Sequence, residues 1–157
     1  MQWHVPLFYA LMVAATVYAL GRGGSAERLV ALLFLAALLG TAYVRSPAAI
    51  VFRHIEVGMF LVDLALFAAL YLLSIFSTRF WPIWMSALQG VTVLSHAVKL
   101  APPPTNFGYA VLEQFWSFPQ LILLIVAVHR HRLRLARNGT DPSWTASFAR
   151  SAPTTPR

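Results

Sequence analysis

The fold of this chain is decided by residues 57–72, which read VGMFLVDLALFAALYL. The apolar run continues to residue 76, and a single charged residue, Asp63, interrupts it. Because about 20 apolar residues in a helix cross the hydrocarbon core of a bilayer, we expect residues 57–76 to span a membrane. A carboxylate at that depth is costly and needs a partner, so Asp63 is the first residue to explain.

The composition of the chain is that of a membrane protein. Hydrophobic residues make up 59% of it and charged residues 11%, whereas a soluble domain is about a quarter charged. The net charge of +7 does not indicate nucleic-acid binding, since basic residues gather at the end of the last apolar run, where they suit phospholipid headgroups. The absence of cysteine excludes disulfides, iron–sulfur clusters and a thiol nucleophile.

Five apolar runs are long enough to be membrane helices. The sequence therefore predicts an all-α polytopic membrane protein with five transmembrane helices, at about residues 3–20, 29–44, 57–76, 81–98 and 109–128. The second run is short, so the flanking Arg28 and Arg45 are expected to extend their side chains to the interface. Residues 1–137 are expected to form one bundle, and the Ser-, Thr-, Pro- and Ala-rich residues 138–157 a disordered cytoplasmic tail.

The distribution of basic residues predicts the orientation. Lys and Arg are enriched on the cytoplasmic side of membrane proteins. A cytoplasmic C-terminus places most of the basic residues near the spans inside, and an odd number of helices then places the N-terminus outside. The inside set is Arg22, Arg28, Arg79, Arg130, Arg132, Arg134 and Arg137, against Arg45, Arg53 and Lys99 outside.

Polar side chains follow one face of each of the last three expected helices. Residues separated by four and three positions lie on the same helix face, and the polar residues of these helices repeat with that spacing. We expect the faces to meet in a buried polar network of Asp63, Gln89, Thr92, His96, Glu113, Ser117 and Gln120. Its outer mouth is expected to consist of Arg53, Glu56 and Lys99.

Two interpretations of this network remain open. In the first, the acids and bases balance one another and the network specifies how the helices pack. In the second, it is a water-lined half-channel of a small ion- or proton-coupled transport or sensing module, with Asp63 and Glu113 as carriers and His96 as the titrating group. The first is favoured because no second set of polar residues continues the path to the cytoplasm.

Catalytic and metal sites have little support in the sequence. Asp63, His96 and Glu113 have suitable ligand atoms for zinc or manganese, but no two of them share a helix turn as in a His-x-x-x-His pair. No Ser or His lies in a nucleophile motif. We therefore expect neither an enzyme nor a cofactor or metal site.

The end of the last helix carries a second candidate surface. Arg130, Arg134 and Arg137 are separated by four and three residues, so they share one helix face beyond the apolar run. Basic side chains at this level attract anionic headgroups, and we expect these three to contact anionic lipid at the cytoplasmic face.

The stretch from Asp63 through Gln89, His96, Glu113 and Trp116-Ser117-Phe118-Pro119 to Arg130-His131-Arg132 resembles small, uncharacterised multi-pass inner-membrane proteins of bacteria. The resemblance implies a bacterial cytoplasmic membrane and carries no activity. The expected role is therefore that of a non-enzymatic structural or accessory subunit, with a membrane-protein partner or a second copy of the chain as its possible partners.

Overall fold

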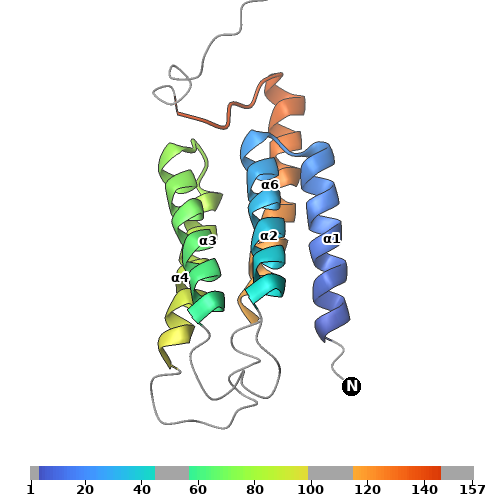
Figure 1. Ribbon diagram of the computed structural model, residues 1–157. Coiled ribbons are helices and arrows are strands. Elements are labelled where there is room, and N and C mark those ends of the chain that lie inside the picture. The colour runs from blue at the N-terminus through green and yellow to red at the C-terminus, as the bar shows by residue number, and fades with distance from the viewer. Residues whose placement is uncertain (1–3, 45–56, 99–114, 146–157) are drawn as a thin grey trace, which may run out of the picture.

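The computed structural model describes residues 4–44, 57–98 and 115–145, and these residues form five helices (Figure 1). The helices are α1 (His4–Arg22), α2 (Ser25–Val44), α3 (Val57–Phe76), α4 (Trp81–Val98) and α6 (Ser117–Asn138). The α1–α2 turn, the α3–α4 turn and the C-terminal end of α6 lie together at one end of the bundle, which we call the turn end. The first residues of α1 lie at the opposite end.

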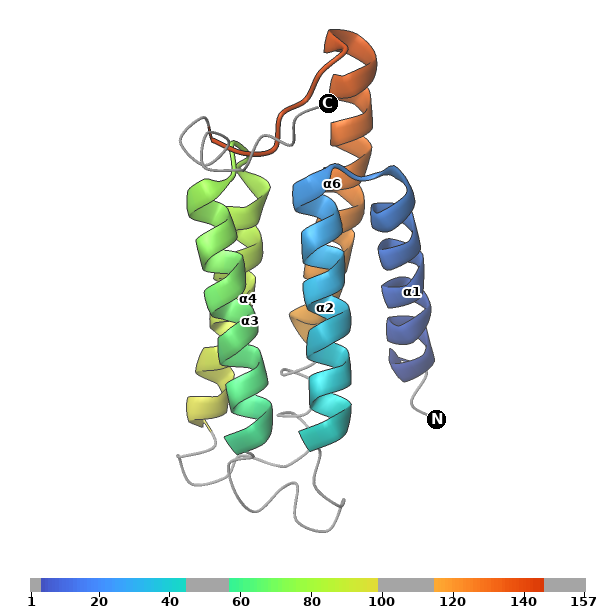
Figure 2. The same cartoon turned by 45° about the horizontal axis from the view of Figure 1, so that its top comes forward.

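The helices pack as two pairs, α1 with α2 and α3 with α4, which meet through α2 and α3 and also through α6. Helix α1 contacts α2 and α6, α3 contacts α2 and α4, and α6 also contacts α2 and α4. In Figure 2, α6 passes behind α2 and its last turns project beyond the other helix ends at the turn end. Helix α6 therefore adds a second connection between the pairs, beside the direct contact of α2 with α3.

The helices agree with the predicted spans and extend beyond two of them. Helices α3 and α4 have the bounds of the predicted spans. Helix α2 begins at Ser25, before the apolar span that starts at residue 29, and α6 continues to Asn138, beyond the span that ends at residue 128. The second extension was expected from the helical spacing of Arg130, Arg134 and Arg137, because a helix is held by backbone hydrogen bonds and continues through polar residues.

Three of the described helices are long and apolar enough to cross a membrane, namely Val5–Arg22 within α1, Ser25–Val44 and Val57–Phe76. The core of the bundle contains small and branched apolar side chains, including Ala15, Ala19, Val30, Leu70 and Leu124. Large apolar side chains also cover the outside, as Leu39 at 70% and Leu94 at 68% exposure show. A bundle that is apolar on both its inside and its outside is compatible with insertion into lipid.

The expected disorder after the last helix is wrong for residues 138–145. Asn138 is the last residue of α6, and Gly139 adopts φ 71° and donates its N–H to Leu135 O over 2.9 Å, which ends the helix. Residues 139–145, which we call the docked segment, then cross to the α3–α4 turn, where Ser77 and Trp144 form an antiparallel bridge. Residues 146–157 lie outside the described part of the chain.

Candidate functional site

Asp63 on α3 is bound by two side chains of α4. Gln89 Nε2 donates to Asp63 Oδ1 over 3.1 Å, and His96 Nε2 lies 2.9 Å from Asp63 Oδ2. Gln89 and His96 are seven residues apart, so both side chains leave α4 on the face that packs against α3. Each oxygen of the carboxylate therefore has its own partner.

Gln89 connects this carboxylate to α6. Its Oε1 accepts a hydrogen bond from Gln120 Nε2 over 3.0 Å, while its own Nε2 also lies 3.3 Å from Asp63 O as a donor. The resulting chain of hydrogen bonds, Gln120 to Gln89 to Asp63, with His96 on the second oxygen, crosses three helices, and we call these four residues the Asp63 network. Gln89 and His96 are 2% exposed and Gln120 is 4% exposed.

The structure brings only part of the predicted network together. Thr92 is buried, but its hydroxyl donates to Leu88 O on its own helix over 3.3 Å. Ser117 is half-buried at the first turn of α6. The expected residues Glu113, Arg53, Glu56 and Lys99 lie outside the described part of the chain.

Replacing Gln120 with alanine is expected to lower the free energy of unfolding by about 1 kcal/mol. The change removes one interhelical hydrogen bond and leaves Gln89 Oε1 without its donor, and such bonds in membrane bundles contribute about 0.6 to 1.7 kcal/mol. Thermal unfolding in detergent measures the loss. The matched control is Ser117→Ala on the same helix, which is expected to change the stability much less, and equal effects of the two variants would argue against the network.

The three arginines that were predicted to form one surface at the end of α6 have different surroundings in the structure. Arg130 and Arg137 are exposed. The side chain of Arg134 is 34% exposed, and its Nε donates to both oxygens of Asp141, over 3.1 and 3.2 Å. Contact with anionic lipid therefore stays a prediction for Arg130 and Arg137, while the guanidinium of Arg134 is engaged within the protein.

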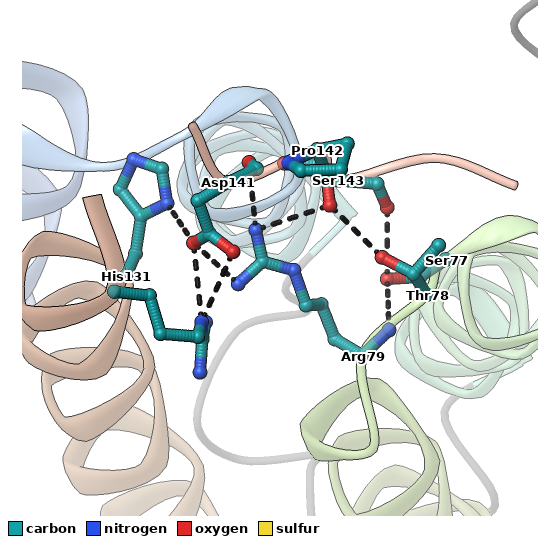
Figure 3. A network of polar contacts seen from close by, with 8 residues as sticks. Ser77, Thr78, Arg79, His131, Asp141, Pro142 and Ser143 are labelled. Atoms are coloured by element: carbon teal, nitrogen blue, oxygen red, sulfur yellow. Dashed lines mark hydrogen bonds and ion pairs between the residues drawn. The ribbon is translucent and has the colours of Figure 1, made fainter. Parts of the chain in front are cut away.

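Asp141 is the centre of a second polar site that the sequence did not predict (Figure 3). Arg79 Nη1 lies 2.8 Å from Asp141 Oδ2, and His131 Nδ1 lies 2.6 Å from the same oxygen. Together with Arg134, these residues form what we call the Asp141 cluster. Its members come from the α3–α4 turn, from α6 and from the docked segment, so one carboxylate joins three elements at the turn end.

Backbone hydrogen bonds hold the docked segment at the same place. Thr78 N–H donates to Ser143 O over 3.2 Å, and Thr145 N–H donates to Phe76 O over 2.9 Å. Arg79 Nη2 donates to the backbone oxygens of Asp141 and Pro142, over 3.0 and 3.3 Å. Two features of the sequence could have indicated this site: Gly139 as a helix C-cap, and an isolated acid that follows a run of arginines.

Glu27 lies beside the cluster as a fully buried carboxylate. It is 0% exposed, and neither of its oxygens has a hydrogen-bond partner among the described residues. Gly24 lies close to both Glu27 and the Asp141 cluster, because a Cβ atom at this position would lie 2.9 Å from Glu27 Oε2 and 2.9 Å from His131 Cε1. The α1–α2 turn therefore approaches α6 closely through a residue that has no side chain.

Within residues 4–44, 57–98 and 115–145, no three His, Asp or Glu side chains are grouped so that they could hold a metal ion. Comparison of the chain with protein families, with curated proteins and with solved structures returns no match. Any statement on function therefore rests on the geometry of the two sites.

Proposed function

We propose that this protein is a small multi-pass protein of a bacterial cytoplasmic membrane with a structural or accessory role and no enzymatic activity. The observation that carries the proposal is the Asp63 network, in which the hydrogen bonds of one carboxylate and two amides join α3, α4 and α6. In lipid, buried polar groups have no water to bind, so a network with matched donors and acceptors holds helices in one arrangement.

The burial of the network supports a structural role over a transport pathway. Gln89, His96 and Gln120 are each at most 4% exposed, whereas a water-lined pathway needs polar side chains that contact solvent. An accessory role also requires a partner, and we propose that this is another membrane protein or a second copy of the chain, in contact with the apolar outer faces of the bundle.

The second candidate is an ion- or proton-coupled module that uses the same residues. One observation favours it, since the side chain of Asp63 is 23% exposed and is therefore the most accessible part of the network. Thermal unfolding of the wild type and of Asp63→Asn in Na⁺, K⁺ and choline buffers separates the two candidates. A structural network predicts a lower Tm for the variant that is equal in all three buffers. A wild-type Tm that rises with one cation, and a variant that lacks this rise, would favour the coupled module.

We further propose five membrane spans, with the turn end cytoplasmic and the N-terminus outside. The turn end has the exposed arginines Arg22, Arg28, Arg130, Arg132 and Arg137, and its described acids, Glu27 and Asp141, are buried or engaged. Exposed aromatic side chains, which favour the interface, lie near both ends of the bundle: Phe80 and Trp84 near the turn end, and Tyr43 at the other end of α2.

Single cysteine residues are expected to show this orientation, because the chain has no cysteine of its own. Tyr43 is 92% exposed at the end of α2, and Arg137 is exposed in the last turn of α6. In intact cells, a membrane-impermeant thiol reagent should label Tyr43→Cys and leave Arg137→Cys unlabelled until the membrane is permeabilised. The reverse pattern would invert the orientation, and equal labelling of both in intact cells would contradict the spanning topology.

A further inference from the structure

The Asp141 cluster contains more hydrogen-bond donors than its carboxylate satisfies. Arg79 Nε and Arg134 Nη2 are buried and have no hydrogen-bond partner among the described residues. The side chain of Arg79 is only 6% exposed, so solvent cannot replace the missing acceptors there. A buried donor without an acceptor is unfavourable, and the site is therefore suited to an anion with more oxygens than a carboxylate.

The place of the cluster in the fold identifies the kind of anion. The cluster lies at the turn end, where the α3–α4 turn, α6 and the docked segment meet, and Gly24 places the α1–α2 turn beside His131. In the proposed orientation, this level of the bundle lies in the headgroup layer of the cytoplasmic leaflet. Phe80, at 81% exposure, and Trp84, at 67%, lie close by in the chain and are side chains that favour this layer.

We propose that Arg79, His131 and Arg134 form a binding site for a phosphate group, and that the Asp141 carboxylate occupies this site in the structure. The phosphate is that of an anionic phospholipid headgroup or free inorganic phosphate. Guanidinium groups match phosphate because their planar N–H groups bind two oxygens at once, and an imidazole adds a further donor. The headgroup form of this inference rests on the proposed membrane topology.

A phosphate has to replace the Asp141 carboxylate in the cluster, because the groups around the site do not suit a second anion beside it. The Asp141 carboxylate already occupies the donors of the cluster, and the acidic residue Glu27 of α2 lies beside His131 with both oxygens buried. The remaining charged groups near the turn end, Arg22 on α1, Arg28 on α2 and Arg130, Arg132 and Arg137 on α6, are exposed cations. The phosphate therefore enters as the Asp141 carboxylate leaves.

The docked segment has contacts that do not depend on that carboxylate. The bonds from Thr78 N–H to Ser143 O and from Thr145 N–H to Phe76 O join backbone atoms, and Arg79 Nη2 binds the backbone oxygens of Asp141 and Pro142. The side chain of Asp141 can therefore leave the cluster while the segment stays in place and Arg79 remains oriented.

The test removes the internal anion and keeps the segment docked. Ser77 and Trp144 are bridge partners, and the double variant Ser77→Cys, Trp144→Cys is expected to form a disulfide that locks the segment, with no native cysteine to compete. In this locked background, Asp141→Asn is expected to bind phosphatidylglycerol about fivefold more tightly than Asp141, as measured by native mass spectrometry in detergent. Phosphatidylcholine, whose headgroup has no net charge, should show a much smaller gain.

Arginine variants in the locked Asp141→Asn background distinguish a site from general attraction. Arg79→Gln and Arg134→Gln are expected to abolish the gain, whereas Arg22→Gln, with the same change of charge at an exposed arginine on α1, should keep it. No gain with Asp141→Asn, or equal losses in all three arginine variants, would overturn the proposal. Disulfide formation in each variant, detected by gel mobility, shows that the segment is still docked, and Arg134→Gln keeps the test valid if Arg79→Gln does not fold.

Competition with inorganic phosphate shows whether the ligand is free phosphate or a lipid headgroup. Competition by millimolar phosphate, but not by chloride at equal ionic strength, would support recognition of the phosphate group itself. Phosphatidylglycerol binding that phosphate does not displace would support the lipid headgroup as the ligand. Carbonate extraction of cell membranes tests the membrane location separately, so a protein that stays in the membrane but fails the binding test would contradict this inference alone.

Discussion

Replacing Asp63 with alanine is expected to lower the free energy of unfolding by about 3 kcal/mol, as measured by thermal or chemical unfolding in detergent. The change leaves Gln89 Nε2 without its carboxylate acceptor, at 3.1 Å, and removes the carboxylate that lies 2.9 Å from His96 Nε2. Because both partners are 2% exposed, water cannot take the place of the carboxylate. The cost is therefore that of unpaired buried groups as well as that of the lost bonds.

Two further variants separate this cause from the loss of side-chain volume. Ser74→Ala, on the same helix, removes a hydroxyl that binds Tyr71 O within one turn, and is expected to change the stability by less than about 0.5 kcal/mol. Replacing all four residues of the Asp63 network, Asp63, Gln89, His96 and Gln120, with leucine should restore part of the stability, because no unpaired polar group of the network then remains. A quadruple variant that is less stable than Asp63→Ala would show that packing, rather than polar pairing, dominates at this place.

Replacing Gly23 with alanine is expected to destabilise the protein by about 1 to 3 kcal/mol, because the new methyl group has no room in the α1–α2 turn. Its Cβ atom would lie 2.5 Å from Ala19 O and 2.9 Å from Glu27 Cβ. The first of these atoms belongs to the backbone of α1, and the second begins a fully buried side chain. Relief therefore requires the turn itself to move, which would also shift Gly24 from its contact with His131.

Gly21 offers a matched control two positions earlier in the chain. A Cβ atom there would have no heavy atom within 4 Å, and Gly21 lies inside α1, where alanine is favoured over glycine by about 1 kcal/mol. Gly21→Ala is therefore expected to leave the Tm unchanged or to raise it, whereas Gly23→Ala lowers it. If both substitutions raise the Tm, the close turn between α1 and α2 is not present in the folded protein.

The sequence predicted the helices and most of their bounds. The bounds of α3 and α4 agree with the predicted spans. Helices α2 and α6 extend beyond their apolar spans into polar residues at the turn end, and for α6 the helical spacing of Arg130, Arg134 and Arg137 indicated this extension. An apolar span therefore reports only part of a helix, because backbone hydrogen bonding does not require an apolar side chain.

Of the two polar sites, the sequence predicted the Asp63 network and not the Asp141 cluster. The spacing of Gln89 and His96 on one helix predicted a shared face, and the depth of Asp63 in its run predicted a need for partners, so the Asp63 network was accessible from the sequence. Nothing in the local sequence around Asp141 indicates Arg79, which is 62 residues away. The arginine surface on α6 was predicted as one surface, yet Arg134 belongs to the Asp141 cluster.

By itself, the sequence determined the all-α class, the apolar character of the helices and the residues that need polar partners, because these depend on composition and on the helical repeat alone. Only the tertiary structure decided that α6 packs against both helix pairs, that the docked segment returns to the α3–α4 turn, and that Glu27 is buried beside His131. These features depend on which helix ends meet in space. That choice is made by packing and by long-range ion pairs, which local spacing does not encode.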